Sequence, residues 1–328
     1  MKFHKTAFVS FAVVVSLGLM ACSRKADSSK TAPRNGSESI APFLGRWDLT
    51  LKAPDREYPS WLELSQENGK LRAQMVGRWG NARPLPNAEI MNGQLNFVSP
   101  KEEEDRKDDM VFKAALNGNT LSGTTTGPDG AVWPWTGERA PSLQRSGTPN
   151  IGKPISLFNG RDLSGWKMSK STSTSVWKVE DGKLISPGQG PELISDPEFQ
   201  DFKLHVEFNC GRDSNSGVYL RGRYEVQIET ESAAEPPSHH TGGVYGFIAP
   251  SPELPRQPSK WQTFDITLIG RTITVVQNGQ TIINNQEIPG ITGGALDSHE
   301  GLSGPIYLQG SEKGHVAFRK IVITPAAE

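Results

Sequence analysis

The chain has 328 residues, and 35 Lys and Arg against 36 Asp and Glu give a formal net charge of −1. This balance excludes a broadly basic nucleic-acid-binding protein. Hydrophobic residues make up 35% of the sequence, which excludes a protein that crosses the membrane many times. Two cysteines are too few for a disulfide scaffold or a cysteine-rich zinc module.

The first residues have the pattern of an export signal. Two lysines precede a mostly apolar run over 7–21, and the run ends in Ala21-Cys22, which resembles a bacterial lipobox. The pattern predicts removal of residues 1–21 as a lipoprotein signal peptide and acylation of Cys22. We therefore expect a protein of the bacterial cell envelope, attached to the membrane by its lipid anchor alone. Ser23 favours the outer membrane, facing the periplasm or the cell surface. An ordinary signal peptide with an incidental cysteine is the alternative.

The next 120 residues or so divide into a polar stretch and a β-rich region. Residues 22–40 are polar without apolar periodicity, which predicts a disordered tether. Residues 41–141 alternate apolar and polar side chains, with Asn-Gly pairs at 68–69, 92–93 and 117–118. Asn and Gly tolerate the positive φ of tight hairpin turns. We expect a small all-β domain here, a β-barrel or sandwich that looks generally lipocalin-like.

Tryptophans are frequent in this first β-rich region. They fit either a sugar-stacking surface or a packed core, and the core is the favoured interpretation. The residues concerned are Trp47, Trp61, Trp79, Trp133 and Trp135.

A second β-rich region follows a linker over 142–153. Residues 154–326 contain short alternating strands at about ten-residue spacing, for example 202–208, 217–220 and 224–228. No segment has a helical period. Many short strands with turns between them predict two packed antiparallel sheets.

Alternation also places polar side chains on one face of several of these strands. Opposite their apolar neighbours, His205 and Glu207 share a face, and so do Glu225 and Gln227. Arg, Glu, Gln, His and Tyr collect on such faces, and these groups hydrogen-bond sugar hydroxyls or transfer protons. A merely solvated sheet face is the alternative.

Several motifs of the second region occur in the order of a known family. LFNGRDLSGW at 157–166, NSGVYLR at 215–221, YEVQI at 224–228 and GPIYLQ at 304–309 resemble the 3-keto-disaccharide hydrolase family over about 151–325. The resemblance implies an all-β fold whose C-terminal part is a concanavalin-like jelly-roll sandwich. It also implies action on glycosides already oxidised at C3 of a glucose unit.

The chemistry implied by this resemblance is β-elimination followed by hydration. A base removes the C2 proton that the ketone acidifies, the glycosidic oxygen leaves C1, and water adds to the resulting 2-hydroxy-glucal. The motifs imply Glu225 or Glu207 as the base and Arg221 as an orienting or enolate-side donor. The implied substrate-binding residues are His205, Asn215, Ser216, Tyr219, Gln227, His240, Tyr245 and Gln309.

Two other functions remain open. The run Glu225-Val226-Gln227-Ile228-Glu229 resembles the catalytic strand of laminarinase-like retaining β-glucanases, but Gln227 removes the central carboxylate. A non-catalytic carbohydrate-binding lipoprotein is favoured by another departure. Many family members carry Asp-His after the motif that matches Leu308-Gln309, whereas Gly310-Ser311 follows here.

The sequence also bears on cofactors and partners. It shows no Gly-rich phosphate loop or dinucleotide fingerprint, so we expect no nucleotide cofactor, and a separate sugar 3-oxidoreductase must supply a 3-keto substrate. A divalent metal stays open, because His205, Glu207, Glu225 and His240 could converge but have no diagnostic ligand spacing. No metal ligand is assigned, and the expected partner is a 3-keto sugar or another carbohydrate rather than nucleic acid.

Overall fold

The computed structural model describes residues 39–327 except 105, 148, 170–176, 187, 189, 231–234 and 312. The predicted signal peptide, the acylation site Cys22 and all but the last two residues of the predicted tether lie outside the described residues. Within the described part of the chain, no helix is long and apolar enough to span a membrane. The only helical segments described are three short 3₁₀ turns, η1 (Ala41–Phe43), η2 (Lys101–Glu104) and η3 (Pro237–His239).

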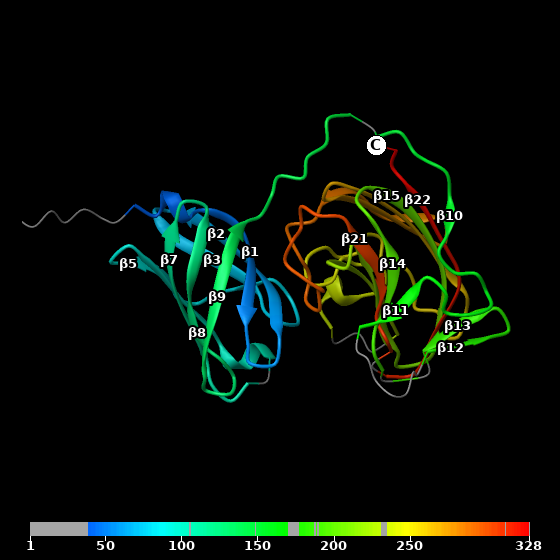
Figure 1. The fold of residues 1–328 in the computed structure, drawn as a ribbon, viewed down its shortest axis with the longest axis horizontal. Coiled ribbons are helices and arrows are strands. Elements are labelled where there is room, and N and C mark those ends of the chain that lie inside the picture. The colour runs from blue at the N-terminus through cyan, green and yellow to red at the C-terminus, as the bar shows by residue number, and fades with distance from the viewer. Residues whose placement is uncertain are drawn as a thin grey trace, which may run out of the picture. The chain divides into compact units, whose positions relative to one another are not determined.

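The N-terminal part is one nine-stranded antiparallel sheet, which we call the N-terminal sheet (Figure 1). Its strand order is β4-β3-β2-β1-β9-β8-β7-β6-β5, so most neighbours in space are also neighbours in sequence. The hairpin turns form where the sequence predicts them, since Asn68 and Asn92 have φ of 51° and 52° and are followed by glycines with positive φ. The strands are β1 (Gly45–Lys52), β2 (Glu57–Glu67), β3 (Lys70–Val76), β4 (Arg83–Pro84), β5 (Ala88–Met91), β6 (Gln94–Ser99), β7 (Met110–Asn117), β8 (Thr120–Thr126) and β9 (Val132–Arg139).

Four of the five N-terminal tryptophans are buried. Trp47, Trp61 and Trp135 are at most 1% exposed and Trp133 is 9% exposed, which confirms the core interpretation for these four. Trp79 is the exception, with 46% of its surface exposed. It lies between β3 and β4, outside the alternating strands that bury the others.

The C-terminal part is a sandwich of two antiparallel sheets (Figure 1). The predicted all-β class with a C-terminal jelly-roll sandwich is confirmed. The larger sheet has the order β12-β13-β22-β15-β18-β19-β20, with β10 also paired to β22. Its strands are β10 (Ile155–Ser156), β12 (Lys178–Glu180), β13 (Lys183–Ser186), β15 (Phe202–Cys210), β18 (Gln262–Ile269), β19 (Thr272–Gln277), β20 (Gln280–Glu287) and β22 (Val316–Pro325).

The smaller sheet carries most of the polar side chains discussed below. Its order is β11-β14-β21-β16-β17, and its strands are β11 (Trp166–Met168), β14 (Leu193–Phe199), β16 (Asn215–Leu220), β17 (Tyr224–Glu229) and β21 (Gly304–Leu308). Alternating apolar residues of both sheets, such as Val206 and Phe208 of β15 and Val226 and Ile228 of β17, join one core.

Strand β17 is buried along its whole length. Its apolar residues face the core, while the segment 242–245 covers its outer edge through backbone hydrogen bonds. Gly242 N donates to Gln227 O at 2.8 Å, Gln227 N donates to Gly243 O at 3.0 Å, and Tyr245 N donates to Glu225 O at 3.0 Å. The interpretation of this strand's polar side as a merely solvated face is therefore wrong.

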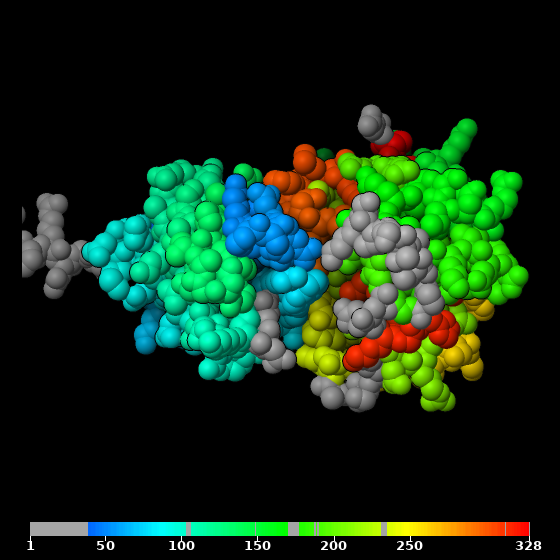
Figure 2. All heavy atoms as spheres, turned by 60° about the horizontal axis from the view of Figure 1, so that its bottom comes forward, coloured from blue at the N-terminus to red at the C-terminus, as the bar shows by residue number. Residues whose placement is uncertain are grey.

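The two β-rich parts belong to one compact unit that spans residues 38–328. Arg46 Nη1 of β1 lies 2.6 Å from Glu287 Oε1, and Thr50 Oγ1 lies 2.5 Å from Ser298 Oγ. The surface view agrees, since the orange segment around residue 298 lies beside blue residues of β1 (Figure 2). Side chains of β1 therefore contact the end of β20 and the loop around Ser298 in the sandwich.

Candidate functional site

A polar hollow of about 310 Å³ lies over β16 and β17 of the smaller sheet. We call it the Glu225 hollow, after the carboxylate in its wall. Antiparallel pairing sets Tyr219 opposite Glu225 and Gly217 opposite Gln227, which aligns the side chains of the two strands on one face. The lining residues are Trp79, Asn215, Tyr219, Glu225, Gln227, Tyr245, Gly293 and Gln309.

Glu225 and Tyr219 form the central contact of this hollow. The Tyr219 hydroxyl lies 2.8 Å from Glu225 Oε2 and 2.9 Å from Gly293 O, and both side chains are almost fully buried. Burial, together with the negative charge of Glu225, raises the pKa of Tyr219 well above its ordinary value. Tyr219 is therefore a neutral phenol with one proton and two acceptors.

Amide side chains supply the other polar groups. Gln227 Nε2 donates to Asn215 Oδ1 at 3.3 Å, and Gln227 Oε1 accepts from Ile228 N at 3.2 Å. The buried Gln309 Oε1 has no hydrogen-bond partner among the described residues. Since a buried acceptor without a partner is unfavourable, a ligand hydroxyl that donates to Gln309 would relieve that cost.

A glycine makes room for the carboxylate. A Cβ atom at Gly217 would overlap Glu225 Oε1 and lie 2.7 Å from its Cγ. No larger residue fits there while Glu225 keeps its position. Because Gly217 has no side chain, the Glu225 carboxylate can lie against β16 at this point.

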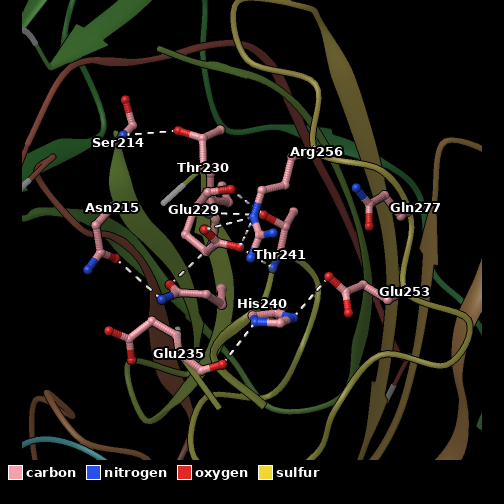
Figure 3. Close-up of polar contacts among 12 residues, drawn as sticks. Ser214, Asn215, Glu229, Thr230, Glu235, His240, Thr241, Glu253, Arg256 and Gln277 are labelled. Atoms are coloured by element: carbon pink, nitrogen blue, oxygen red, sulfur yellow. Dashed lines mark hydrogen bonds and ion pairs between the residues drawn. The ribbon is translucent and has the colours of Figure 1, made fainter. Parts of the chain in front are cut away.

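A further group of charged side chains lies at the end of β17 and in the chain that follows it (Figure 3). Glu229 is 3% exposed and accepts a hydrogen bond from Arg256 Nε at 3.0 Å. The two ring nitrogens of His240 lie 3.1 Å from Glu235 O and 3.0 Å from Glu253 Oε1, as Figure 3 shows. His240 does not line the Glu225 hollow, nor does it line a smaller hollow of about 70 Å³ that lies beside it.

His239 rather than His240 faces the site. Its ring stacks on Tyr245 with centroids 4.1 Å apart, and its nitrogens lie 2.7 Å from Asn81 Oδ1 and 3.1 Å from Glu235 Oε2. Burial lowers the pKa of His239. His239 also lines the smaller hollow of about 70 Å³ that shares Asn215, Gln227 and Tyr245 with the first. The expectation of His240 as a substrate-binding residue is therefore not matched by a place in either hollow, whereas His239 lines the smaller one.

The structure brings together only part of the predicted site. Of the predicted residues, Glu225, Asn215, Tyr219, Gln227, Tyr245 and Gln309 line the hollow. Ser216 lies beneath it, fully buried, and its hydroxyl donates to Gln309 O at 2.9 Å. Ser216 therefore positions the chain next to Gln309 rather than contacting a ligand.

Glu207 and His205 do not belong to this hollow. Both are on β15 of the larger sheet, whereas Glu225 is on β17 of the smaller one. Glu207 pairs with Arg319 at 2.5 Å and His205 lies 2.7 Å from Asp265. The hydrogen bond from Arg319 lowers the pKa of Glu207, which makes this carboxylate a weaker base. The expectation of Glu207 as an alternative base beside Glu225 is corrected by this placement.

Arg221 is also displaced from the position that alternation predicts. Strand β16 ends at Leu220, and Arg221 has φ of 53°, so its side chain leaves the face that Tyr219 occupies. The guanidinium is fully buried and donates to Gly270 O at 2.8 Å and to Tyr224 Oη at 3.1 Å. Arg221 therefore supports the fold under the β16–β17 turn and does not line the hollow.

The remaining groups give no metal centre within the described residues, where no cluster of three or more His, Cys, Asp or Glu could hold a metal ion. His205, Glu207 and His240 are not among the residues that line the hollow with Glu225. Sequence reasoning missed Gly293 as a neighbour of the site, and it favoured a core position over a sugar-stacking one for Trp79. The available signal for Trp79 was its place in Gly77-Arg78-Trp79-Gly80, after the alternation of β3 ends.

Another hollow of about 340 Å³ lies on the N-terminal sheet, and its lining includes Leu51, Met75, Phe112 and Trp133. Among the described side chains that line it, none is a carboxylate or an amide. The Glu225 hollow is therefore the better candidate for proton transfer and for hydrogen bonding to sugars.

The fold and the hollow together define a jelly-roll protein with a sugar-sized, hydrogen-bonding cavity over one sheet. The model of the 3-keto-α-glucoside-1,2-lyase-like domain family matches residues 153–324, and the chain belongs to this family. A 75-residue stretch is 29% identical to a 3-keto-disaccharide hydrolase of Bacteroides thetaiotaomicron. That match covers 20% of this chain and spans about a quarter of the relative, 26% of its length.

Two of the solved structures that the chain matches come from Parabacteroides distasonis. One, described as a proposed glycosyl hydrolase, is 27% identical, with a TM-score of 0.45 over 55% of this chain and 92% of that chain. A second, described in the same way, is 18% identical, with a TM-score of 0.44 over 53% of this chain and 94% of that chain.

Proposed function

We propose that this protein cleaves glycosides that carry a ketone at C3 of a glucose unit. The observation that carries the proposal is a buried carboxylate, Glu225, in a hollow whose other walls are amides, phenols and an indole. Membership of the 3-keto-α-glucoside-1,2-lyase-like family supports the same substrate class. A ketone at C3 acidifies the C2 proton, and a positioned carboxylate is a suitable base for it.

The elimination step needs a base and a stabilised enolate. Glu225 takes the C2 proton, the C2 electron pair forms the C1=C2 double bond as the C1–O bond breaks, and the leaving oxygen takes a proton from water. Amide N–H groups such as those of Gln227 and Gln309 are suitable donors to charge that develops on the C3 oxygen. Water then adds across the double bond, with hydroxide at C1 and the proton returned to C2 by Glu225.

Tyr219 accommodates both protonation states of Glu225. When the carboxylate is ionised, the phenol donates its proton to Glu225 Oε2. When Glu225 has taken the substrate proton, the phenol can donate to Gly293 O and accept from the carboxyl group instead. The two acceptors at 2.8 and 2.9 Å make this exchange a rotation of one hydroxyl group.

The retaining β-glucanase alternative receives less support from the geometry. It requires two carboxylates that act together on one bond. Glu229 is paired with Arg256 and is not among the residues that line the Glu225 hollow. Among the residues that the structure describes, Glu225 is the one carboxylate that lines that hollow.

The location and supply of substrate are also proposals. The lipobox-like Ala21-Cys22 supports a lipid-anchored protein of the bacterial envelope. A separate sugar 3-oxidoreductase would make the ketone, because the sequence offers no dinucleotide-binding fingerprint for that oxidation.

The test is incubation of the purified protein with 3-keto-glucosides and, separately, with unmodified glucans. We expect sugar release, with transient enone absorbance, from the 3-keto substrates only. Glu225→Gln should lower kcat by at least about 100-fold, in the range of a lost general base, while the matched change Glu207→Gln on the larger sheet should leave kcat within about twofold. Cleavage of unmodified glucan would contradict the proposal. So would binding without turnover, which selects the carbohydrate-binding function.

A further inference from the structure

A short segment of the N-terminal sheet is fixed against the rim of the Glu225 hollow. Residues 78–82 belong to the connection between β3 and β4, and a backbone hydrogen bond holds each end of this segment to the sandwich. Gly294 N donates to Arg78 O at 3.1 Å, and Ala82 N donates to Gly246 O at 3.4 Å. Between them, Asn81 Oδ1 lies 2.7 Å from His239 Nε2. Three contacts therefore fix the segment 78–82 at the site.

The sandwich loops are shaped to receive this segment. A Cβ atom at Gly293 would lie 3.0 Å from Trp79 Cα and from Gly80 N. A Cβ atom at Gly246, whose φ is 75°, would lie 3.0 Å from Asn81 Cα. Glycines thus occupy the positions where the segment passes closest, and larger side chains there would push it away.

This arrangement places Trp79 at the Glu225 hollow. It is the half-exposed exception among the five N-terminal tryptophans, and its indole lines the Glu225 hollow. It also lines the hollow of about 340 Å³ on the N-terminal sheet and a second hollow of about 390 Å³, whose lining includes Tyr58, Arg78 and Tyr307. Arg78 Cζ lies 4.4 Å from the Tyr58 ring centroid and 5.0 Å from that of Trp79, which gives the second hollow aromatic walls backed by a guanidinium.

We propose that Trp79 is a specificity-determining residue that stacks against the leaving group of the substrate. The inference rests on the proposed function, because the 3-keto ring must lie beside Glu225 for its C2 proton to be removed. Trp79 is the residue that the Glu225 hollow and the second hollow share. The group attached at C1 of the bound 3-keto ring therefore extends from the Glu225 hollow past Trp79. The favoured substrates are 3-keto-glucosides whose leaving group has a flat apolar face, whether an aryl group or a second pyranose.

The experiment compares three substrates, the 3-keto derivatives of methyl glucoside, 4-nitrophenyl glucoside and a glucose disaccharide. With Trp79→Ala in the full chain, kcat/KM should fall about tenfold for at least one substrate with a ring as leaving group, because an aromatic contact is lost. For the methyl glucoside it should change less than about twofold. Trp79→Phe should retain most of the parent value. The substrates for which kcat/KM falls identify the favoured leaving group as aryl, pyranose or both.

Leu302→Ala is the matched control, since Leu302 is 61% exposed and lines none of the three hollows that contact Trp79. Its kcat/KM should equal that of the parent for all three substrates. An equal loss for all three in Trp79→Ala, or no loss for any, overturns the inference. If the parent cleaves none of them, the proposed function fails instead. Calorimetric binding of methyl and 4-nitrophenyl 3-keto-glucosides then tests Trp79 by itself, and a preference for the aryl ligand that survives Trp79→Ala overturns its stacking role.

Discussion

At the scale of single residues, the most informative group is the Tyr219 hydroxyl. It carries one proton, which its raised pKa retains, and it faces a carboxylate and a carbonyl at nearly equal distance. Such a group holds Glu225 in one orientation without fixing its protonation state. The ring itself is held by stacking on Tyr307, with centroids 4.2 Å apart.

We therefore expect Tyr219→Phe to lower kcat on a 3-keto-glucoside by about 10- to 100-fold, with a smaller change in KM. The ring and its stacking partner remain, so the loss reports the hydroxyl group alone. Steady-state kinetics on the purified variant measures it. Tyr224→Phe is the control, because it removes a buried phenol hydroxyl that donates to another carboxylate, Glu300, and Tyr224 does not line the Glu225 hollow. Equal kcat in Tyr219→Phe and parent would show that the hydroxyl has no catalytic part.

At the scale of elements, the pairing of β16 with β17 places a glycine against the carboxylate. Gly217→Ala would bring a Cβ atom into the space of Glu225 Oε1, so either the carboxylate or the strand must move. We expect at least about a tenfold loss of kcat/KM and a decrease of about 1–3 kcal/mol in the free energy of unfolding, as for other overpacked sites. Gly301→Ala is the control, since its new Cβ would meet nothing nearer than 3.7 Å. Denaturant unfolding and kinetics that match the parent in Gly217→Ala would contradict this account.

Alternation along single strands predicted much of the site and also produced its errors. It correctly placed Glu225 and Gln227 on one side of β17, because side chains alternate in any extended strand. It could not tell that Glu207, with an equally good pattern on β15, belongs to the other sheet, since sheet order depends on long-range pairing. The pattern also failed where β16 ends and Arg221 takes a left-handed conformation.

The position of Trp79 beside the Glu225 hollow could not be predicted from the sequence, for a different reason. Trp79 and Glu225 line one hollow although they are more than 130 positions apart in the sequence. No local pattern encodes such a placement. Its geometry depends on glycines 246 and 293, whose role is visible only once the segment 78–82 lies against them.

At the scale of the whole molecule, buried charges lie where the N-terminal sheet contacts the sandwich. Asp48 of β1 is 5% exposed and Glu300 is fully buried. Glu300 accepts hydrogen bonds from Tyr224 Oη at 2.7 Å and from Arg271 Nη1 at 3.0 Å. Burial, and next the charge and hydrogen bond of Glu300, raise the pKa of Asp48 to about 9. A protonated Asp48 can share its proton with Glu300, whereas an ionised Asp48 would repel it.

This arrangement predicts how the stability of residues 38–328 depends on pH. The folded protein keeps a proton on Asp48 up to about pH 9, whereas the unfolded chain releases it near the ordinary pKa of 3.8. This group's contribution to stability therefore falls as pH rises through that window. Asp48→Asn removes the titration and keeps a donor toward Glu300. We expect its free energy of unfolding to exceed that of the parent by a margin that grows from pH 5 to pH 9, measured by denaturant unfolding. Asp181→Asn, at a carboxylate whose side chain is 89% exposed, is the control and should follow the parent. Parallel pH profiles for Asp48→Asn and parent would mean that Asp48 is ionised in the folded protein.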